Sequence, residues 1–354
     1  MKLALVFAAV LFLHAPEAVQ FRVEGSAVHL DVVVTGPNQL FVPRLTLDDF
    51  EVLENGVRQE VSFFSSDDVA PLTLVLLLDA SSSIEPSEKG IKKAASNLVR
   101  EMTPRDQTAV VVFSDSVKTS THFTAFQEPL LDAIGSLHPA GWTALYDAIL
   151  HSLDKLSRIE GRKALLVFTD GSDSRPAAVG SKASLEEAIE AGKHSEVTIY
   201  TVGFVAAARE VNRDFLERLA RATGGRAFFP VNVDHLERSF SAIQDEFHTQ
   251  YRIGYTPKND VRDGAWRRIE VRIKGQPNLI VRTRQGYYAV TRSNSRDPLW
   301  IVDVFLDTRH LVRHASHRTD RMRPRSCARS RTTAAPPTPS STRTDRDRLV
   351  AQKR

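Results

Sequence analysis

Cysteine is almost absent from this chain, since Cys327 is the only one among 354 residues. A single thiol cannot form an intramolecular disulfide, and residues 1–326 offer neither a thiolate ligand for zinc nor a cysteine nucleophile. Long apolar runs are scarce too. Beyond residue 20, no segment reaches the roughly 18 apolar residues that a membrane-spanning helix needs. We therefore expect no disulfide framework, no zinc–thiolate site and no transmembrane helix after the N-terminal segment.

Several motifs of nucleotide-binding and hydrolytic enzymes are also missing. The chain has no G-x-x-x-x-G-K-[ST] loop, no G-x-G-x-x-G after an apolar strand, and no G-x-S-x-G elbow followed by a partner histidine. These absences argue against the common machinery of phosphoryl and acyl transfer.

The formal net charge of +4 is unevenly distributed. Residues 308–354 contain 13 Lys or Arg and 3 Asp or Glu, a charge of +10, which leaves −6 for residues 1–307. The basic character thus belongs to the C-terminal segment. We expect no nucleic-acid binding by the mildly acidic body of the protein.

The C-terminal segment, residues 293–354, lacks hydrophobic periodicity and is rich in Arg, Ser, Thr and Pro, which predicts a disordered basic tail. His310, His314 and His317 could serve as metal ligands. A solvated tail is the preferred interpretation, because nothing around these histidines would orient them toward an ion.

The first 20 residues have the pattern of a signal peptide. Lys2 precedes an apolar run from Leu3 to Leu13, which matches the length of a signal-peptide core. The alternative is a buried N-terminal strand. The pattern favours a protein that is secreted or located in the periplasm or cell envelope.

Three patterned segments lie between the two ends. Residues 21–69 alternate apolar and polar side chains and contain Asn55-Gly56, a strong hairpin signal. Residues 70–248 alternate short apolar runs with amphipathic helical patterns, as in a parallel sheet covered on both faces. Residues 249–292 return to alternation.

These segments together predict the fold class. We expect an α/β fold with a doubly wound, mostly parallel, Rossmann-like sheet in residues 70–248. Because two or three strands are marginal alone, residues 21–69 and 249–292 are expected to pair into a small antiparallel β-sandwich that flanks this sheet.

Polar residues follow the apolar strands at the edge where ligands bind in open parallel sheets. Two carboxylates and three hydroxyls are expected to meet there. This oxygen-only set suits Mg²⁺, with Mn²⁺ as a possible substitute. With at most two anionic ligands, such an ion would attract a partner's Asp or Glu to an open position. The predicted metal ligands are Asp79, Ser81, Ser83, Thr143 and Asp170.

Each of these residues also has a simpler interpretation. Asp79, Ser81 or Thr143 could cap a following helix, and Asp170 could start a turn. Asp115 and Asp173 also stand at strand ends, where we expect them to support the ligands or to form turns; direct ligation of the metal is the less favoured alternative. The sequence leaves open which residues would bind the ion directly and which through water.

The motifs at these positions resemble those of the von Willebrand factor type A domain. "DASSS" (79–83) resembles its Asp-x-Ser-x-Ser element, "GWTALYDAI" its threonine loop, and "LLVFTDGSDS" its second aspartate strand. The resemblance implies a metal-ion-dependent adhesion site formed by the five residues named above. The β-rich flanks are similar to those of exported bacterial proteins related to this domain, a group that implies binding or scaffolding.

Three functions follow as hypotheses. The first is a non-enzymatic, Mg²⁺-dependent adhesion module that captures an acidic side chain of a protein partner. The second is a structural envelope scaffold that binds through its β-sandwich. The third and least favoured is a Mg²⁺-dependent hydrolase, for which no base is evident beside Ser81 or Ser83.

Overall fold

The computed structural model describes residues 27–66, 70–174, 180–204 and 211–289. All of them belong to one compact unit. The predicted signal peptide and basic tail, including Cys327 and the three tail histidines, lie outside the described residues.

A six-stranded sheet forms the centre of the α/β part. Its order is β10-β9-β8-β5-β6-β7, and every neighbouring pair is parallel except β6 and β7. The strands β5 and β8 lie in the middle and are buried along nearly their whole length, because helices cover both faces. The strands are β5 (Leu72–Asp79), β6 (Gln107–Phe113), β7 (Val117–Thr119), β8 (Arg162–Thr169), β9 (Thr198–Gly203) and β10 (Ala227–Phe228).

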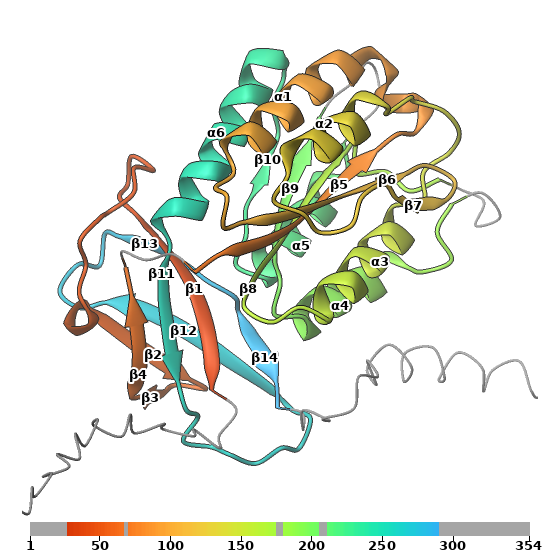
Figure 1. Cartoon of the computed structure of the whole chain (residues 1–354). Helices are drawn as coiled ribbons and strands as arrows, with labels where there is room; N and C mark the ends of the chain where they lie inside the picture. Colours follow the sequence, from red (N-terminus) through yellow and green to blue (C-terminus); the bar gives the residue numbers. More distant parts are fainter. Residues whose placement is uncertain (1–26, 67–69, 175–179, 205–210, 290–354) are drawn as a thin grey trace, which may run out of the picture. The chain divides into compact units, whose positions relative to one another are not determined.

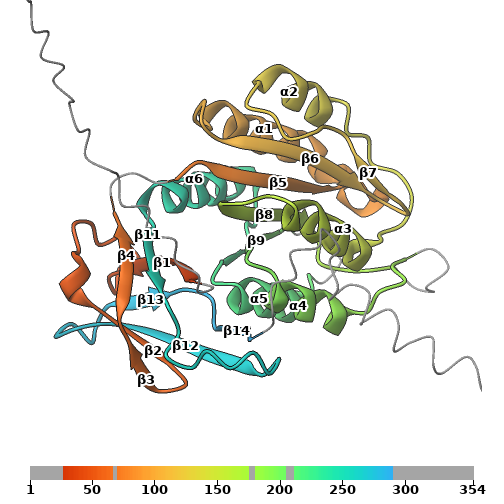
Figure 2. The ribbon, with the colours of Figure 1, turned by 60° about the horizontal axis from the view of Figure 1, so that its bottom comes forward.

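Helices pack on the two faces of this sheet (Figure 1). Figure 2 shows α1 and α2 on one side and α3, α4 and α5 on the other. Side chains of β5 alternate between the faces: Leu74 and Leu76 contact the first group and α6, whereas Val75 and Leu77 contact the second. The helices are α1 (Glu88–Glu101), α2 (Gln127–Gly135), α3 (Leu145–Ser157), α4 (Leu185–His194), α5 (Arg213–Ala222) and α6 (Val233–Thr249).

Two four-stranded antiparallel sheets lie beside the α/β part, in the orders β13-β1-β11-β4 and β14-β12-β2-β3. Both combine strands from before and after the α/β segment, since β1 pairs with β11 and β2 pairs with β12. Their inner faces share one apolar core. The strands are β1 (Val28–Thr35), β2 (Phe50–Glu54), β3 (Val57–Gln59), β4 (Val61–Ser65), β11 (Tyr251–Tyr255), β12 (Trp266–Ile273), β13 (Ile280–Arg282) and β14 (Gly286–Tyr288).

The fold class expected from the sequence is therefore confirmed: a mostly parallel, helix-covered sheet with small antiparallel sheets beside it. The predicted hairpin is also present. Asn55 and Gly56 connect β2 to β3 with φ angles of 48° and 81°, as a two-residue hairpin turn requires. Where one folding domain ends and the next begins remains a prediction.

Ionic and aromatic contacts join α4 and α6 to the C-terminal strands. The carboxylate of Glu246, at the end of α6, is 1% exposed and lies 2.7 Å from the Arg282 guanidinium and 3.7 Å from that of Arg226. Tyr288 donates a hydrogen bond to Glu190 (2.8 Å), and its ring stacks on His194 at 4.0 Å between centroids. These contacts fix the β-sandwich against the helices.

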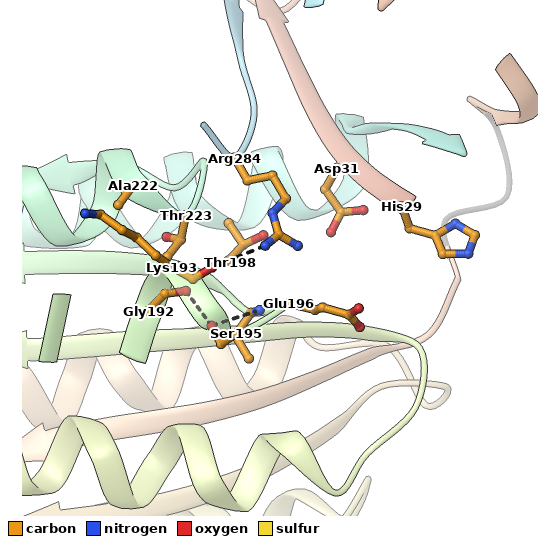
Figure 3. Close-up of a pocket in the computed structure, with 11 residues that line it drawn as sticks. His29, Asp31, Gly192, Lys193, Ser195, Glu196, Thr198, Ala222, Thr223 and Arg284 are labelled. Atoms are coloured by element: carbon orange, nitrogen blue, oxygen red, sulfur yellow. Dashed lines mark hydrogen bonds between the residues drawn. The ribbon is translucent and has the colours of Figure 1, made fainter. Parts of the chain in front are cut away.

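A small pocket lies at the amino end of β9, next to β1 (Figure 3). Arg284 extends into it and donates hydrogen bonds to the backbone carbonyls of Gly286 (2.8 Å) and Lys193 (3.4 Å). Asp31 and Glu196 also line this pocket, so charges of both signs offset each other there. We interpret the pocket as part of the polar contact between β1 and the α/β part.

Candidate metal centre

Asp79 lies at the carboxyl end of β5, between β6 and β8, and its side chain is fully buried. One carboxylate oxygen accepts a hydrogen bond from the Thr169 hydroxyl (2.7 Å), and the other accepts one from the Ser81 backbone N–H (2.8 Å). Burial raises the pKa of Asp79 to about 6; the hydrogen bonds oppose this shift, and the charge of Asp170 adds to it. A bound cation would favour the charged form of this buried carboxylate.

Ser81 and Ser83 follow directly, at the start of a short 3₁₀ segment (Ser82–Ser87). Their hydroxyl oxygens lie 2.9 Å apart. Ser81 is the N-cap residue of this segment, but its hydroxyl caps no backbone N–H. The capping interpretation of the Ser81 side chain is therefore wrong, and two adjacent hydroxyls are presented beside Asp79.

Thr143 belongs to the loop between α2 and α3, and it is 6% exposed. Two hydrogen bonds join Thr143 to Ser174, which lies in the chain after β8. The Thr143 N–H donates to the Ser174 hydroxyl (2.9 Å), and the Ser174 N–H donates to the Thr143 carbonyl (2.9 Å). On the other side, the Ser82 N–H donates to the Gly141 carbonyl (3.1 Å). Ala144, and not Thr143, is the N-cap residue of α3. The capping interpretation of Thr143 is wrong.

Asp170 follows β8 and is 5% exposed. One of its oxygens accepts a hydrogen bond from the Ser172 backbone N–H (3.0 Å), which is the turn that the sequence allows. That bond occupies one lone pair of one oxygen, so the carboxylate retains acceptor capacity. Asp170 also lies near enough to influence the ionisation of Asp79.

Asp115 and Asp173 hold the loops of this edge. Asp115 accepts a hydrogen bond from the Trp142 N–H (3.3 Å). Asp173 accepts three, from the backbone N–H of Leu145 (2.7 Å) and from the N–H (3.0 Å) and hydroxyl (2.7 Å) of Ser181. These bonds fix both ends of the threonine loop. Thr169 and Ser174, which the sequence pattern did not single out, form hydrogen bonds directly with Asp79 and Thr143.

The donor set fits a hard divalent cation. Carboxylate and hydroxyl oxygens come from three chain segments that are hydrogen-bonded to one another, and no imidazole or thiolate lies among them. Within the described ranges, no cluster of three or more His, Cys, Asp or Glu side chains could hold a metal. An ion at this edge would therefore depend on the serine and threonine hydroxyls together with two carboxylates, as Mg²⁺ allows.

Gly141 provides a test of this loop geometry. Its φ is +80°, and a Cβ built there would lie 1.9 Å from an Asp115 carboxylate oxygen. We expect Gly141→Ala to displace Asp115, to lower the free energy of unfolding by roughly 1–3 kcal/mol, and to weaken Mg²⁺ binding about tenfold. Urea unfolding and calorimetric Mg²⁺ titration measure the two effects.

Gly264 provides the matched control, because its φ is +73° and nothing lies within 4 Å of its added Cβ. Gly264→Ala has a similar backbone cost and should leave the Mg²⁺ affinity unchanged. Equal Mg²⁺ affinities for both variants would contradict the role given to the loop.

Residues 73–243 match the sequence profile described as the von Willebrand factor type A domain. A curated relative, the UPF0353 protein of Mycolicibacterium paratuberculosis, is 24% identical over 223 residues. The match covers 56% of this chain and 66% of the relative, so the chain spans slightly less than two thirds of the relative's length. No helix in the described part of the chain has the length and apolar character needed to cross a membrane.

The chain is similar to many solved structures, and two of them show the extent of the similarity. A von Willebrand factor type A protein from Catenulispora acidiphila is 12% identical, with a TM-score of 0.45 and coverage of 78% of both chains. Proximal thread matrix protein 1 from the mussel byssus, with zinc in its metal-ion-dependent adhesion motif, is 19% identical, with a TM-score of 0.45 and coverage of 55% of this chain and 49% of that one. With its profile match and its helix-covered parallel sheet, the chain contains a von Willebrand factor type A domain in residues 73–243.

Proposed function

We propose that this protein binds other proteins through a divalent cation and catalyses no reaction. In this proposal Asp79, Ser81, Ser83, Thr143 and Asp170 hold one Mg²⁺, for which Mn²⁺ can substitute, and an Asp or Glu of the partner completes the shell. The observation that supports it best is the set of hydrogen bonds that joins the threonine loop to the chain after β5 and to the chain after β8.

The chemistry of the set supports capture rather than catalysis. Domains of this family often bind partners through divalent cations, and their proteins are mostly non-enzymatic. A bound Mg²⁺ would supply a Lewis-acidic position for an external carboxylate. Hydrolysis would also need a base within hydrogen-bond reach of the attacking water. The hydrogen bonds described above for Asp79, Ser81, Thr143 and Asp170 involve no histidine or lysine that could act as this base.

The location of the protein belongs to the same proposal. The signal-peptide pattern of residues 1–20 favours export. We therefore propose that the protein acts in the periplasm, at the cell envelope or as a secreted protein.

Calorimetric titration with Mg²⁺ and capture on immobilised peptides that carry one glutamate test the proposal. Capture should require Mg²⁺ and disappear with EDTA. Thr143→Ala should weaken capture about tenfold or more, because it removes one ligand oxygen from a set that is otherwise intact. The exposed Thr249, at the end of α6, gives the control Thr249→Ala, which should behave as the wild type.

The β-sandwich hypothesis predicts the opposite pattern. If a partner binds through the sandwich, EDTA and Thr143→Ala leave its capture unchanged. Absence of Mg²⁺ uptake by the intact protein would refute the metal-dependent function directly.

A further inference from the structure

Trp142 is a large apolar side chain that directly precedes Thr143 and belongs to none of the apolar cores of the described residues. It is 53% exposed, whereas the other described tryptophan, Trp266, packs edge-on against Tyr288 at 4.9 Å between centroids. Exposed tryptophans are frequent among the residues that dominate protein interfaces. Its place next to a candidate metal ligand makes this one a candidate contact for the partner.

The loop that carries Trp142 is fixed on both sides of the indole. The Ala140 N–H donates to the Ala80 carbonyl (2.8 Å), and the Ala144 N–H donates to the Ser114 carbonyl (2.7 Å). The Trp142 N–H itself donates to Asp115 (3.3 Å). The backbone at Trp142 is thus anchored to the chain after β5 and after β6. A side chain presented from a fixed loop loses little conformational entropy on binding.

Asp115 gives this exposed aromatic surface a negative charge. Its side chain is exposed, and the N–H of Trp142 occupies only one of its two oxygens. An indole face attracts cations, and Arg binds both aromatic faces and carboxylates well. The described cation–π pairs place Lys or Arg over phenylalanine rings, so this indole has no such partner in the described part of the chain. The surface therefore complements an external basic side chain.

We propose that Trp142 and Asp115 form a second contact point beside the metal centre and select partner segments in which an Arg or Lys lies a few residues from the acidic side chain. This inference rests on the proposed function and names its partner class. Since Trp142 adjoins Thr143, a short extended segment, which rises about 3.3 Å per residue, is long enough to reach both contacts.

The test uses synthetic peptides with one fixed glutamate. In each peptide one other position carries Arg, Gln or Leu, and this position differs from peptide to peptide. Binding to the full chain is measured in Mg²⁺ and in EDTA. We expect the best Arg peptide to bind the wild type about tenfold more tightly than its Gln counterpart. The ratio of these two affinities should fall to about one in Trp142→Ala. It should fall partway in Asp115→Asn, which keeps an oxygen for the Trp142 N–H and removes the charge.

Phe126 supplies the matched control, because it is 78% exposed and far from the carboxyl ends of the strands. It lies near the amino end of β6, where Thr124 bridges to Thr108. Phe126→Ala should retain the full preference for Arg. Mg²⁺-dependent binding of the wild type without any preference for Arg overturns this inference and leaves the metal-dependent function standing. A preference for the Leu peptides overturns it too. Absence of Mg²⁺-dependent binding by all peptides refutes both.

Discussion

Asp79→Ala is expected to abolish the stabilisation that Mg²⁺ gives to the wild-type protein. At a Mg²⁺ concentration of 100 times the dissociation constant, binding to the native state raises the free energy of unfolding by about 2.7 kcal/mol. Asp79 is buried at the centre of the candidate ligand set, and its carboxylate is the charge on which the ion would depend most. Thermal unfolding of both proteins, with Mg²⁺ and with EDTA, measures the effect.

Without the metal, the same substitution should cost little stability. The buried carboxylate is unfavourable in its charged form, so its removal offsets part of the lost hydrogen bonds with Thr169 and Ser81. Capture of glutamate peptides by Asp79→Ala should fall about 100-fold or more. Asp245→Ala removes an exposed carboxylate from α6 and should retain both the Mg²⁺ effect and capture. A variant at Asp79 that still gains stability from Mg²⁺ would contradict the proposed ligand set.

The central sheet could be predicted closely from the sequence because each strand carries its own signal. One of the short apolar runs within residues 70–248, LTLVLLLD, coincides with β5, and the helical patterns of that segment correspond to α1, α3, α4, α5 and α6. Two elements of this part, α2 and β7, were not predicted from the sequence pattern. The helix α2 has only nine residues with Pro129 in its first turn, and β7 is a three-residue antiparallel edge strand. Short elements depend on tertiary contacts more than on periodicity.

The sandwich shows a different limit of sequence reasoning. Alternation predicts which residues of β1 and β12 face inward, and Leu30 and Val271 do so. Alternation contains no information on which strands become neighbours. The strand β1 pairs with β11 and β13, which follow the whole α/β segment in the sequence. Pairing over such separations is decided by packing in three dimensions.

At the candidate site, the sequence supplied the five oxygen-bearing residues but not the bonds that position them. Thr169 precedes Asp170 and Ser174 follows it within the same motif, so both were visible as polar residues at a strand end. Their roles depend on contacts with Asp79 and Thr143 across the sheet edge. Motif spacing places residues on the correct edge, and only the folded backbone shows which hydroxyls support the others.

Arg282→Ala is expected to lower the free energy of unfolding by about 3 kcal/mol, because it leaves the buried carboxylate of Glu246 without its closest cation. The Arg282 guanidinium lies 2.7 Å from Glu246 and also donates to the Gly224 carbonyl (3.0 Å). The remaining cation, Arg226, is 3.7 Å away. Urea unfolding followed by circular dichroism measures the change. Arg268→Ala, at an exposed position of β12, is the control and should change stability by less than about 0.5 kcal/mol.

The two halves of this ion pair should differ in their effects. Glu246→Gln leaves Arg282 and Arg226 partly exposed, at 23% and 36%, so water can solvate both guanidinium groups. Arg282→Ala leaves a carboxylate that is only 1% exposed in the wild type, so water solvates it less well than the two guanidinium groups. We therefore expect the loss of the arginine to cost more than the loss of the charge on Glu246, and the double variant to recover part of that cost. Equal costs for both single variants would mean that Glu246 gains water when Arg282 is removed, and that α6 and β13 separate there more easily than their packing implies.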